Sequence, residues 1–239
     1  MSVPSADVLR WGHERAKTGS WRGETAVAFL NPLPDAPAPS AEFLLRCLAT
    51  LAERGFTRVV TGALSPLEQV GFLAAGFDVA ERLHLLGLDL TAGLPPLPDG
   101  PAPVRVRRKR RGEVLRVDAA AFSTFWGFDE RGLSDALTAT PRTRFRMVGG
   151  HGGGPVAGYA ICGRAGHRGF VQRLAVHPCR QRQGHGRMLL LDGLHWMRRH
   201  GSRTAVVNTQ LDNAVALGLY TGIGFREQPT GLSVLSAGL

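Results

Sequence analysis

The clearest pattern of apolar and polar positions lies in residues 104–239, where helix-like and strand-like stretches follow one another. Apolar residues three and four apart indicate an amphipathic helix, whereas a short apolar or alternating run between turn residues indicates a strand. The helix pattern covers residues 112–122, 130–139, 184–200 and 213–221. The strand pattern covers residues 104–108, 145–149, 155–162, 169–176 and 204–208, with a final strand pair from residue 225 onward. This order predicts an α/β (α+β) fold in which helices flank a central sheet.

Residues 1–93 carry a weaker form of the same order. Their pattern predicts a helix at residues 43–54, a strand at 57–61, a helix at 66–75 and, after Gly76-Phe77, an apolar strand at 83–90. The helix–strand–helix–Gly-Phe order recurs in residues 201–225, and such self-similarity predicts a tandem arrangement with an abbreviated first copy. The alternative is that a common order of elements recurs by coincidence.

Two proline-rich segments, residues 31–39 and 94–103, interrupt these patterns. The second has the composition of a stiff interdomain linker. We therefore expect residues 1–93 to form one domain, residues 94–103 a Pro-rich linker and residues 104–239 a second domain. The first segment precedes a helix of the N-terminal copy, and its prolines remove main-chain donors there.

A basic, glycine-containing loop follows the strand predicted at residues 169–176 and opens the next helix. A helix N-terminus carries free N–H groups and a partial positive charge, so it suits a phosphate group. Gly184 and Gly186 allow the main chain to approach a ligand closely. The dinucleotide fingerprint fails because Leu189 occupies its third glycine position, and no Gly-Lys-Ser/Thr triplet supports a Walker loop. The loop therefore predicts a different phosphate-bearing ligand.

Two motifs together identify that ligand by resemblance. The loop reads Gln181-x-x-Gly184-x-Gly186 after a Val-x-Pro strand end, and Asn213-x-x-Ala216-x-x-Leu219-Tyr220-x-x-x-Gly224-Phe225 follows downstream. This pair resembles the GCN5-related N-acetyltransferase (GNAT) family. The resemblance implies a GNAT fold with a mixed, mostly antiparallel sheet, and an N-acetyltransferase that moves an acetyl group from acetyl-CoA to a primary amine. It makes residues 104–239 the catalytic domain and residues 1–93 a smaller, degenerate GNAT-like copy.

The resemblance also implies roles for individual residues. The strand residues Leu174, Ala175 and Val176 would splay from residues 204–208, and one or more main-chain N–H groups near Ala175 and Val176 would contact the thioester oxygen. The main chain of the loop would hold the diphosphate of CoA through Gln181, Arg182, Gln183, Gly184, His185, Gly186 and Arg187. Asn213 would contact CoA, although it could simply cap its helix.

Tyr220 is the candidate general acid for the leaving thiolate. Reference pKa values of about 10 for a phenol and about 8.5 for a thiol put the cost of this proton transfer near ~2 kcal/mol. The structural alternative is a tyrosine that packs on the sheet. In the N-terminal copy Phe72 holds the corresponding position, four residues before Gly76, and a phenyl ring cannot donate a proton.

The general base is missing from its usual place. Many relatives carry a glutamate on the strand before the loop, where this chain has Gln172 or Arg173. About a third of α-amines are neutral near pH 7.5, but only about 0.1% of lysine side chains are. We therefore expect a low-pKa acceptor, such as a protein or peptide α-amine or an amine-bearing small molecule.

The acceptor pocket of relatives is lined by the segment that here contains Phe125, Trp126 and Asp129. Asp129 could act as a base or anchor the amine, or could belong to an acidic first helical turn. The aromatic residues could equally form an apolar helix face packed on the core.

Composition adds limits to this interpretation. The net charge is +10, mostly from arginine, and the densest basic run is residues 105–111. A charged strand edge explains this run, and it lacks the interleaved aromatics of a nucleic-acid platform, so we expect no nucleic-acid partner. The three cysteines are odd in number and have no metal-ligand spacing, so we expect no metal.

No apolar run is long enough for a membrane span and no secretory signal is evident, so we expect no membrane partner and a cytoplasmic location. The sequence leaves the oligomeric state open. The alternative function is a non-catalytic acyl-CoA-binding or ribosome- or RNA-associated module on the same fold.

Overall fold

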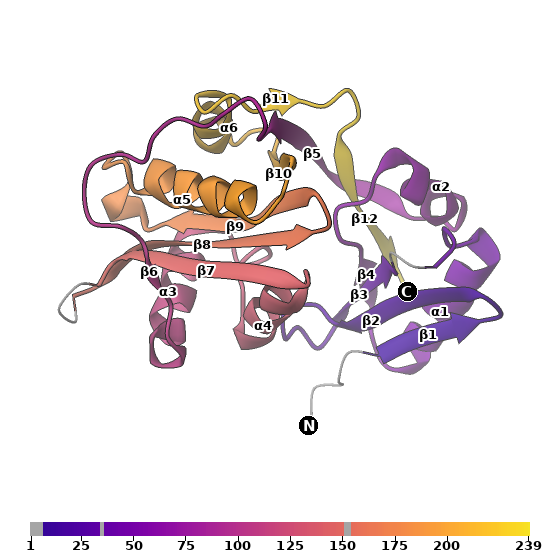
Figure 1. The fold of residues 1–239 in the computed structure, drawn as a ribbon. Coiled ribbons are helices and arrows are strands. Elements are labelled where there is room, and N and C mark those ends of the chain that lie inside the picture. The colour runs from indigo at the N-terminus through magenta and orange to yellow at the C-terminus, as the bar shows by residue number, and fades with distance from the viewer. Residues whose placement is uncertain (1–6, 34–35, 151–153) are drawn as a thin grey trace. The chain divides into compact units, whose positions relative to one another are not determined.

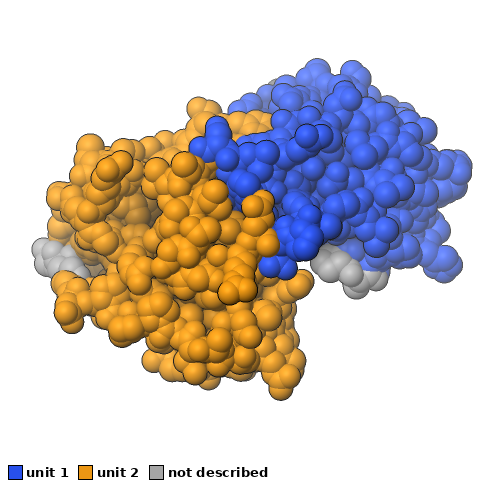
Figure 2. Space-filling view, turned by 90° about the horizontal axis from the view of Figure 1, so that it is seen from above, with its two compact units in different colours: residues 1–85, 209–212, 228–239 blue, residues 86–208, 213–227 orange. Residues whose placement is uncertain are grey.

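The computed structural model describes residues 7–33, 36–150 and 154–239 (Figure 1). The chain divides into two compact units, which Figure 2 colours separately. Unit 1 comprises residues 1–85, 209–212 and 228–239, and unit 2 comprises residues 86–208 and 213–227.

Unit 1 is a six-stranded sheet with two helices. Its strands, in sheet order, are β1 (Asp7–Trp11), β2 (Glu14–Ser20), β3 (Val27–Pro32), β4 (Arg58–Val60), β12 (Leu232–Gly238) and β5 (Asp78–Asp89). Strands β3 and β4 are parallel and are joined through α1 (Ala41–Glu53), while α2 (Pro66–Ala74) connects β4 to β5. Phe43, Leu51 and Phe72 form part of the core between the helices and the sheet.

Unit 2 contains the elements predicted for residues 104–239 except the last strand, which lies in unit 1. Its strand order is β5, β10 (Thr204–Gln210), β9 (Arg168–Val176), β8 (Val156–Ala165), β7 (Arg142–Gly149) and β6 (Val104–Arg105), and β11 (Arg226–Glu227) pairs with β5. Helices α5 (His185–Arg199) and α6 (Ala214–Thr221) cover one face, and α3 (Arg111–Ala121) and α4 (Glu130–Thr138) cover the other (Figure 1). The predicted α/β fold with a mixed, mostly antiparallel sheet is therefore confirmed.

Several expected elements differ from the structure. Strand β6 has only two residues, and a 3-10 turn (Arg108–Arg110) follows it. The last two strands do not pair with each other, because β11 pairs with β5 while β12 pairs with β4 and β5. The first three strands were not predicted. Strand β2 buries the polar side chains of Thr18 and Ser20, so it lacks an apolar alternation.

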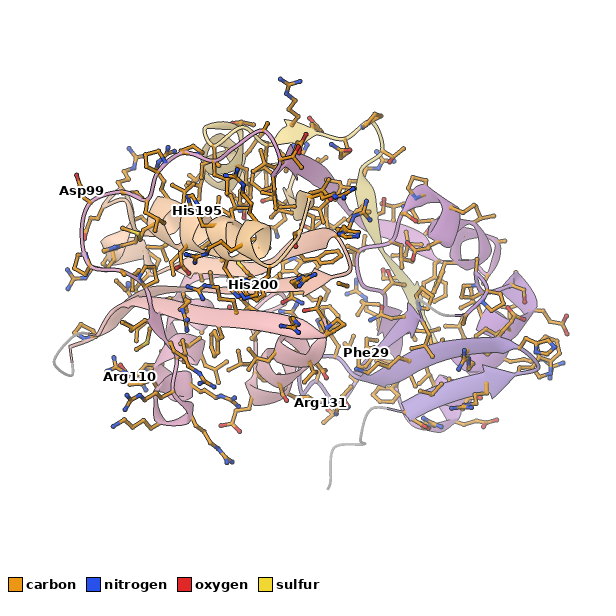
Figure 3. The ribbon with its side chains drawn as sticks, viewed as in Figure 1. Phe29, Asp99, Arg110, Arg131, His195 and His200 are labelled. Carbon is orange, nitrogen blue, oxygen red and sulfur yellow. The ribbon has the colours of Figure 1, made fainter. Side chains whose placement is uncertain are left out.

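Strand membership also crosses the halves of the sequence. Strand β12, at the C-terminal end, supplies Leu235 to the core of unit 1, whereas Leu86 and Leu90 belong to the core of unit 2. The Pro-rich residues 94–103 lie in unit 2, where His195 Nε2 is 2.9 Å from the Pro95 carbonyl; Figure 3 labels His195 on α5. The domain limits expected from the sequence stay a prediction.

Candidate active site

Strands β9 and β10 separate after a short parallel stretch. Their paired residues are Thr204 with Arg168, Ala205 with Gly169 and Val206 with Phe170. Beyond this point β9 continues alongside β8, and His177 N–H donates to the Ala157 carbonyl on the β8 side at 2.8 Å. Hydrogen-bonding direction alternates along a strand, so the N–H groups of Leu174 and Val176 turn toward the opening. The splay expected between these strands is present.

The loop after β9 enters α5 in a conformation that leaves main-chain donors free. Gly184 caps the helix in the left-handed region (φ 78°) and provides no side-chain cap. The first helical hydrogen bond runs from Met188 N–H to the Gly184 carbonyl at 2.9 Å. Within the described ranges, no acceptor is found for the N–H groups of residues 182–187. These donors and the helix dipole suit an anion.

The side chains of this loop differ in their exposure to solvent. Residues 180–184 are exposed, so the side chains of Arg180 and Arg182, which belong to the same loop as the free donors, are accessible to solvent. Arg187 is half-buried, and its Nη1 donates to the Gly222 carbonyl at the end of α6 at 3.4 Å. Arg187 therefore ties α5 to α6 in addition to carrying charge.

Gly186 brings α5 and α6 close together. A Cβ atom at Gly186 would lie 3.3 Å from Leu219 Cδ2 and 3.7 Å from Val176 Cγ2. The first turn of α5 therefore packs against both α6 and the end of β9. This contact joins the two sequence motifs in space.

Helix α6 places Asn213 and Tyr220 at its opposite ends. The Asn213 side chain accepts a hydrogen bond from Ala216 N–H at 3.0 Å, so Asn213 caps the helix as the structural alternative anticipated. Tyr220 is 5% exposed, and its ring centroid lies 5.7 Å from that of Phe225. Its hydroxyl has no hydrogen-bond partner among the described residues.

Burial controls the ionisation of Tyr220. Removal from water raises the pKa of this phenol above its ordinary value, and the nearby Cys162 thiol adds to the shift. Burial likewise raises the pKa of Cys162 to about 12. Both groups are therefore protonated and neutral near pH 7.

Arg173, which with Gln172 stands where the resemblance would put a glutamate, forms a buried ion pair. Its Nε and Nη2 donate to the two carboxylate oxygens of Asp118, each at 2.8 Å. Asp118 on α3 is 0% exposed and also accepts from the Tyr159 hydroxyl. Desolvation and the Asp118 charge raise the pKa of Tyr159 well above its ordinary value. No proton acceptor is free at this position.

The same arginine holds the aromatic segment against β9. Its Nη2 donates to the Trp126 carbonyl at 2.7 Å, and its guanidinium carbon lies 3.4 Å from the ring centroid of Phe122 and 4.0 Å from that of Phe128. Asp118 fixes the far end of the segment by accepting from Phe128 N–H at 2.6 Å. We name Asp118, Tyr159 and Arg173 the arginine clamp.

The predicted acceptor residues lie in or beside this segment. The rings of Phe125 and Trp126 are half-buried, with centroids 5.1 Å apart in an edge-to-face arrangement. Asp129 caps α4 by accepting from Gly132 N–H at 2.6 Å, which is the structural alternative anticipated for it. A contact of any of the three with an acceptor stays a prediction.

The arginine clamp was not predicted from the sequence. Its one local signal is Asp118, a carboxylate within the apolar stripe of α3 beside the buried Val114 and Val117. An ionisable residue at such a position needs a buried partner. The sequence does not reveal that the partner lies on β9.

The described ranges lack two further features. There, no group of three or more His, Cys, Asp and Glu side chains is arranged to hold a metal ion. No helix of these same ranges has the length and apolar character needed to cross a membrane.

Comparison with known proteins places these features in a family. The profile of the acetyltransferase (GNAT) family matches residues 116–225. Mycothiol acetyltransferases from a Nocardioides strain and from Rhodococcus jostii are 30% and 32% identical over 63% and 70% of this chain. The chain spans only 59% and 63% of those two proteins. The mycothiol acetyltransferase of Amycolatopsis mediterranei is 28% identical over 94% of this chain and 79% of its own length.

Solved structures show the same fold across both units. A tandem GNAT protein from the clavulanic acid biosynthesis pathway superposes with a TM-score of 0.72 at 16% identity, covering 99% of this chain and 84% of its own. A putative acetyltransferase from Novosphingobium aromaticivorans gives 0.60 at 18% identity, covering 97% and 91%. At such identities the likeness shows the fold alone, and that fold is a tandem GNAT fold.

Proposed function

The chain belongs to the acetyltransferase (GNAT) family, and on that premise we propose that it is an acetyl-CoA-dependent N-acetyltransferase acting through unit 2. The observation that carries the proposal is the open N-terminus of α5. Its free N–H groups, left-handed Gly184 cap and exposed arginines lie beside the end of β9. We place the diphosphate of CoA on residues 181–187 for this reason.

The opening between β9 and β10 then receives the thioester. The N–H groups of Leu174 and Val176 turn into this opening and supply donors for the oxyanion that develops on the carbonyl oxygen. Such donors typically contribute a few kcal/mol to lowering the barrier. The Tyr220 end of α6 borders the same side through the Gly186–Leu219 contact. We propose that Asn213, at the other end of α6, also contacts CoA, as the family resemblance implies.

Tyr220 is proposed as the general acid. The amine nitrogen attacks the thioester carbon, the C–S bond breaks, and the departing thiolate takes the Tyr220 hydroxyl proton. The proton lost by the amine passes to solvent, from which the phenolate is reprotonated. A buried phenol stays protonated at all physiological pH values, although its raised pKa increases the free energy of the proton transfer.

The acceptor is proposed to be a low-pKa primary amine. Tyr220 packs in the core on the α5 and α6 face, whereas Ala175 and the arginine clamp lie on the α3 and α4 face. Donor and acceptor would thus reach β9 from opposite faces. Neither Gln172 nor Arg173, the two residues at the usual position of the base, can accept a proton, and Arg173 is paired with Asp118, which supports an amine that is already neutral. A peptide α-amine and a small-molecule amine both satisfy this condition. The relatives called mycothiol acetyltransferases are named for a small molecule.

Thiol release from acetyl-CoA, measured across a panel of amines, tests the proposal. We expect turnover with α-amines or other low-pKa amines to exceed that with lysine side chains in matched blocked peptides. Tyr220→Phe retains the buried ring, so CoA affinity by calorimetry should be unchanged while kcat falls about 100-fold or more. CoA binding without turnover on any amine would instead support the non-catalytic acyl-CoA-binding module. Faster acetylation of lysine would overturn the acceptor class.

A further inference from the structure

Unit 2 contains a second basic site, away from the α5 N-terminus. A cavity of about 430 Å³ lies beside β6 and β7, and its lining includes Arg105, Arg111, Arg144, Arg146 and Trp196. Trp196 follows the start of α5 by 11 residues, so at 1.5 Å per residue the cavity lies about 16 Å along the helix from His185. It is therefore separate from the loop proposed to hold CoA.

The positive charge in this cavity is mostly uncompensated. Arg144 donates to Asp192 through Nε at 2.8 Å and Nη2 at 2.7 Å, so these two charges cancel. Arg105, Arg111 and Arg146 have no carboxylate partner within the described ranges. The Nε of Arg146 is buried without any hydrogen-bond partner there. Three arginines thus line one cavity without an ion pair of their own, and the nearby Asp192 is already paired with Arg144.

The strand register brings two of these charges directly opposite each other. Strands β6 and β7 are antiparallel, and Arg105 is the cross-strand neighbour of Arg146. Like charges in this position destabilise a sheet. Burial, together with the charges of Arg144 and Arg105, lowers the pKa of Arg146, while Asp192 opposes the shift. A bound anion would relieve this repulsion.

We propose that this cavity is a binding site for a small phosphate-bearing molecule, held by Arg105, Arg111 and Arg146. Three unpaired cations match the two or three negative charges of a phosphate ester or diphosphate better than one carboxylate. Guanidinium groups also bind phosphate oxygens in pairs. The volume suits a compact metabolite rather than a polymer. The site does not depend on the acetyl transfer proposed above.

Calorimetry on the full chain, with inorganic pyrophosphate as the probe and CoA present at saturation, tests the site. We expect saturable binding of one pyrophosphate per chain and weaker binding of inorganic phosphate. Arg105→Gln and Arg146→Gln should each weaken pyrophosphate at least 10-fold. Arg180→Gln, which changes an exposed arginine of the CoA loop, should leave this affinity unchanged and serves as the matched control.

A second variant distinguishes a loss of pyrophosphate binding from a loss of folding. Arg105→Glu places an opposite charge across from Arg146, so we expect a higher melting temperature together with loss of pyrophosphate binding. Three results would overturn the proposal: no saturable binding in the presence of CoA, affinity that depends on Arg180 rather than on Arg105 and Arg146, or citrate binding as tightly as pyrophosphate. The last would remove phosphate as the recognised group.

Discussion

Residues 27–77, in unit 1, and residues 168–225, all but four of which lie in unit 2, share one backbone plan. In each, a strand leads through a helix to a second strand that pairs with it in parallel, as β3 with β4 and β9 with β10. Each plan closes with a second helix, a left-handed glycine and a phenylalanine. Phe77 N–H donates to the Phe72 carbonyl and Phe225 N–H to the Tyr220 carbonyl, both at 3.1 Å. The recurrence seen in the sequence is therefore also present in the backbone.

The two segments differ at the N-terminus of their first helix. In unit 1, both the N–H and the Oγ of Ser40, which caps α1, donate to the Glu14 carboxylate, at 2.5 and 2.9 Å. In unit 2, α5 begins at Gly184, which has no side chain to cap it, and no carboxylate contact is found among the described residues. Unit 1 thus supplies an anion from its own chain, whereas unit 2 leaves the position open.

This difference fits the proposal that unit 2 binds CoA and unit 1 does not, although the backbone plan is the same. The same helix terminus is either satisfied internally or kept free for a ligand. The two units also differ four residues before the glycine of this plan. Unit 2 has Tyr220, whose phenol can donate a proton, and unit 1 has Phe72, whose ring cannot. Four predictions follow from the contrast, in order of expected effect.

The largest effect should come from deleting residues 229–239. This deletion removes β12 and with it Leu235, which is fully buried in the core of unit 1. Loss of a whole core strand exceeds the stability margin of a typical domain, so we expect unit 1 to unfold, as measured by circular dichroism and urea denaturation.

A point substitution tests the same prediction in a chain that still folds. Leu235→Ala in the full chain should lower the free energy of unfolding by about 2–5 kcal/mol. Leu239→Ala should lower it by less than about 1 kcal/mol, because Leu239 is 38% exposed. A deleted chain that melts at the urea concentration of the intact protein would contradict the assignment of β12 to unit 1.

The second largest effect should come from Asp118→Asn in unit 2. The Arg173 and Asp118 side chains are 9% and 0% exposed, so removing the carboxylate leaves a buried, unpaired cation. We expect a loss of about 3–5 kcal/mol in urea denaturation. Glu42→Gln breaks an exposed pair with Arg46 in unit 1 and should cost less than about 0.5 kcal/mol. Equal losses in the two variants would show that the arginine clamp is not a buried charge network.

A smaller effect should follow from Glu14→Ala, which removes the carboxylate at the α1 N-terminus. Loss of a carboxylate that accepts two hydrogen bonds at a cap should cost about 1–2 kcal/mol. Glu53→Ala, at the exposed opposite end of α1, should change stability by less than about 0.5 kcal/mol. Turnover of acetyl-CoA should be unaffected by both. A drop in turnover for Glu14→Ala would mean that unit 1 contributes to catalysis.

The last substitutions, with a stability cost similar to that of Glu14→Ala, give the sharpest contrast between the two units. Gly184 and Gly76 have φ values of 78° and 86°, and a Cβ at either would meet nothing within 4 Å. Each Gly→Ala substitution should therefore cost about 1–2 kcal/mol of backbone strain. Only Gly184→Ala should also weaken CoA, by several-fold in calorimetry, because it alters the donors at α5. Equal CoA affinity in the two variants would place the diphosphate elsewhere.

Helices α3 to α6 could be predicted to within about two residues because their signals are local. Apolar spacing, the capping Asn213 and the turn glycines all act within a few residues. Strands β1 to β3 could not be predicted in this way. Buried polar residues such as Thr18 obscure the alternation, and Thr18 is satisfied by the Phe29 carbonyl on the neighbouring strand.

The candidate site divides along the same line. Its loop and its tyrosine could be identified from spacing, since the glycines and the free donors belong to one short segment. The arginine clamp could not, because Arg173 and Asp118 are 55 residues apart and meet only when β9 packs against α3. The arginine-lined cavity likewise depends on the register that sets Arg105 opposite Arg146.

The sequence by itself determined the order of elements in residues 104–239, the recurrence in residues 27–77 and the family. These are properties of short segments, where periodicity and glycine conformation act locally. Only the tertiary structure decided that β12 belongs to the sheet of unit 1, that Glu14 accepts hydrogen bonds from Ser40 at the start of α1, and that Arg173 forms an ion pair with Asp118. Each of these is a contact between distant segments, and its energy depends on burial and geometry that no local pattern encodes.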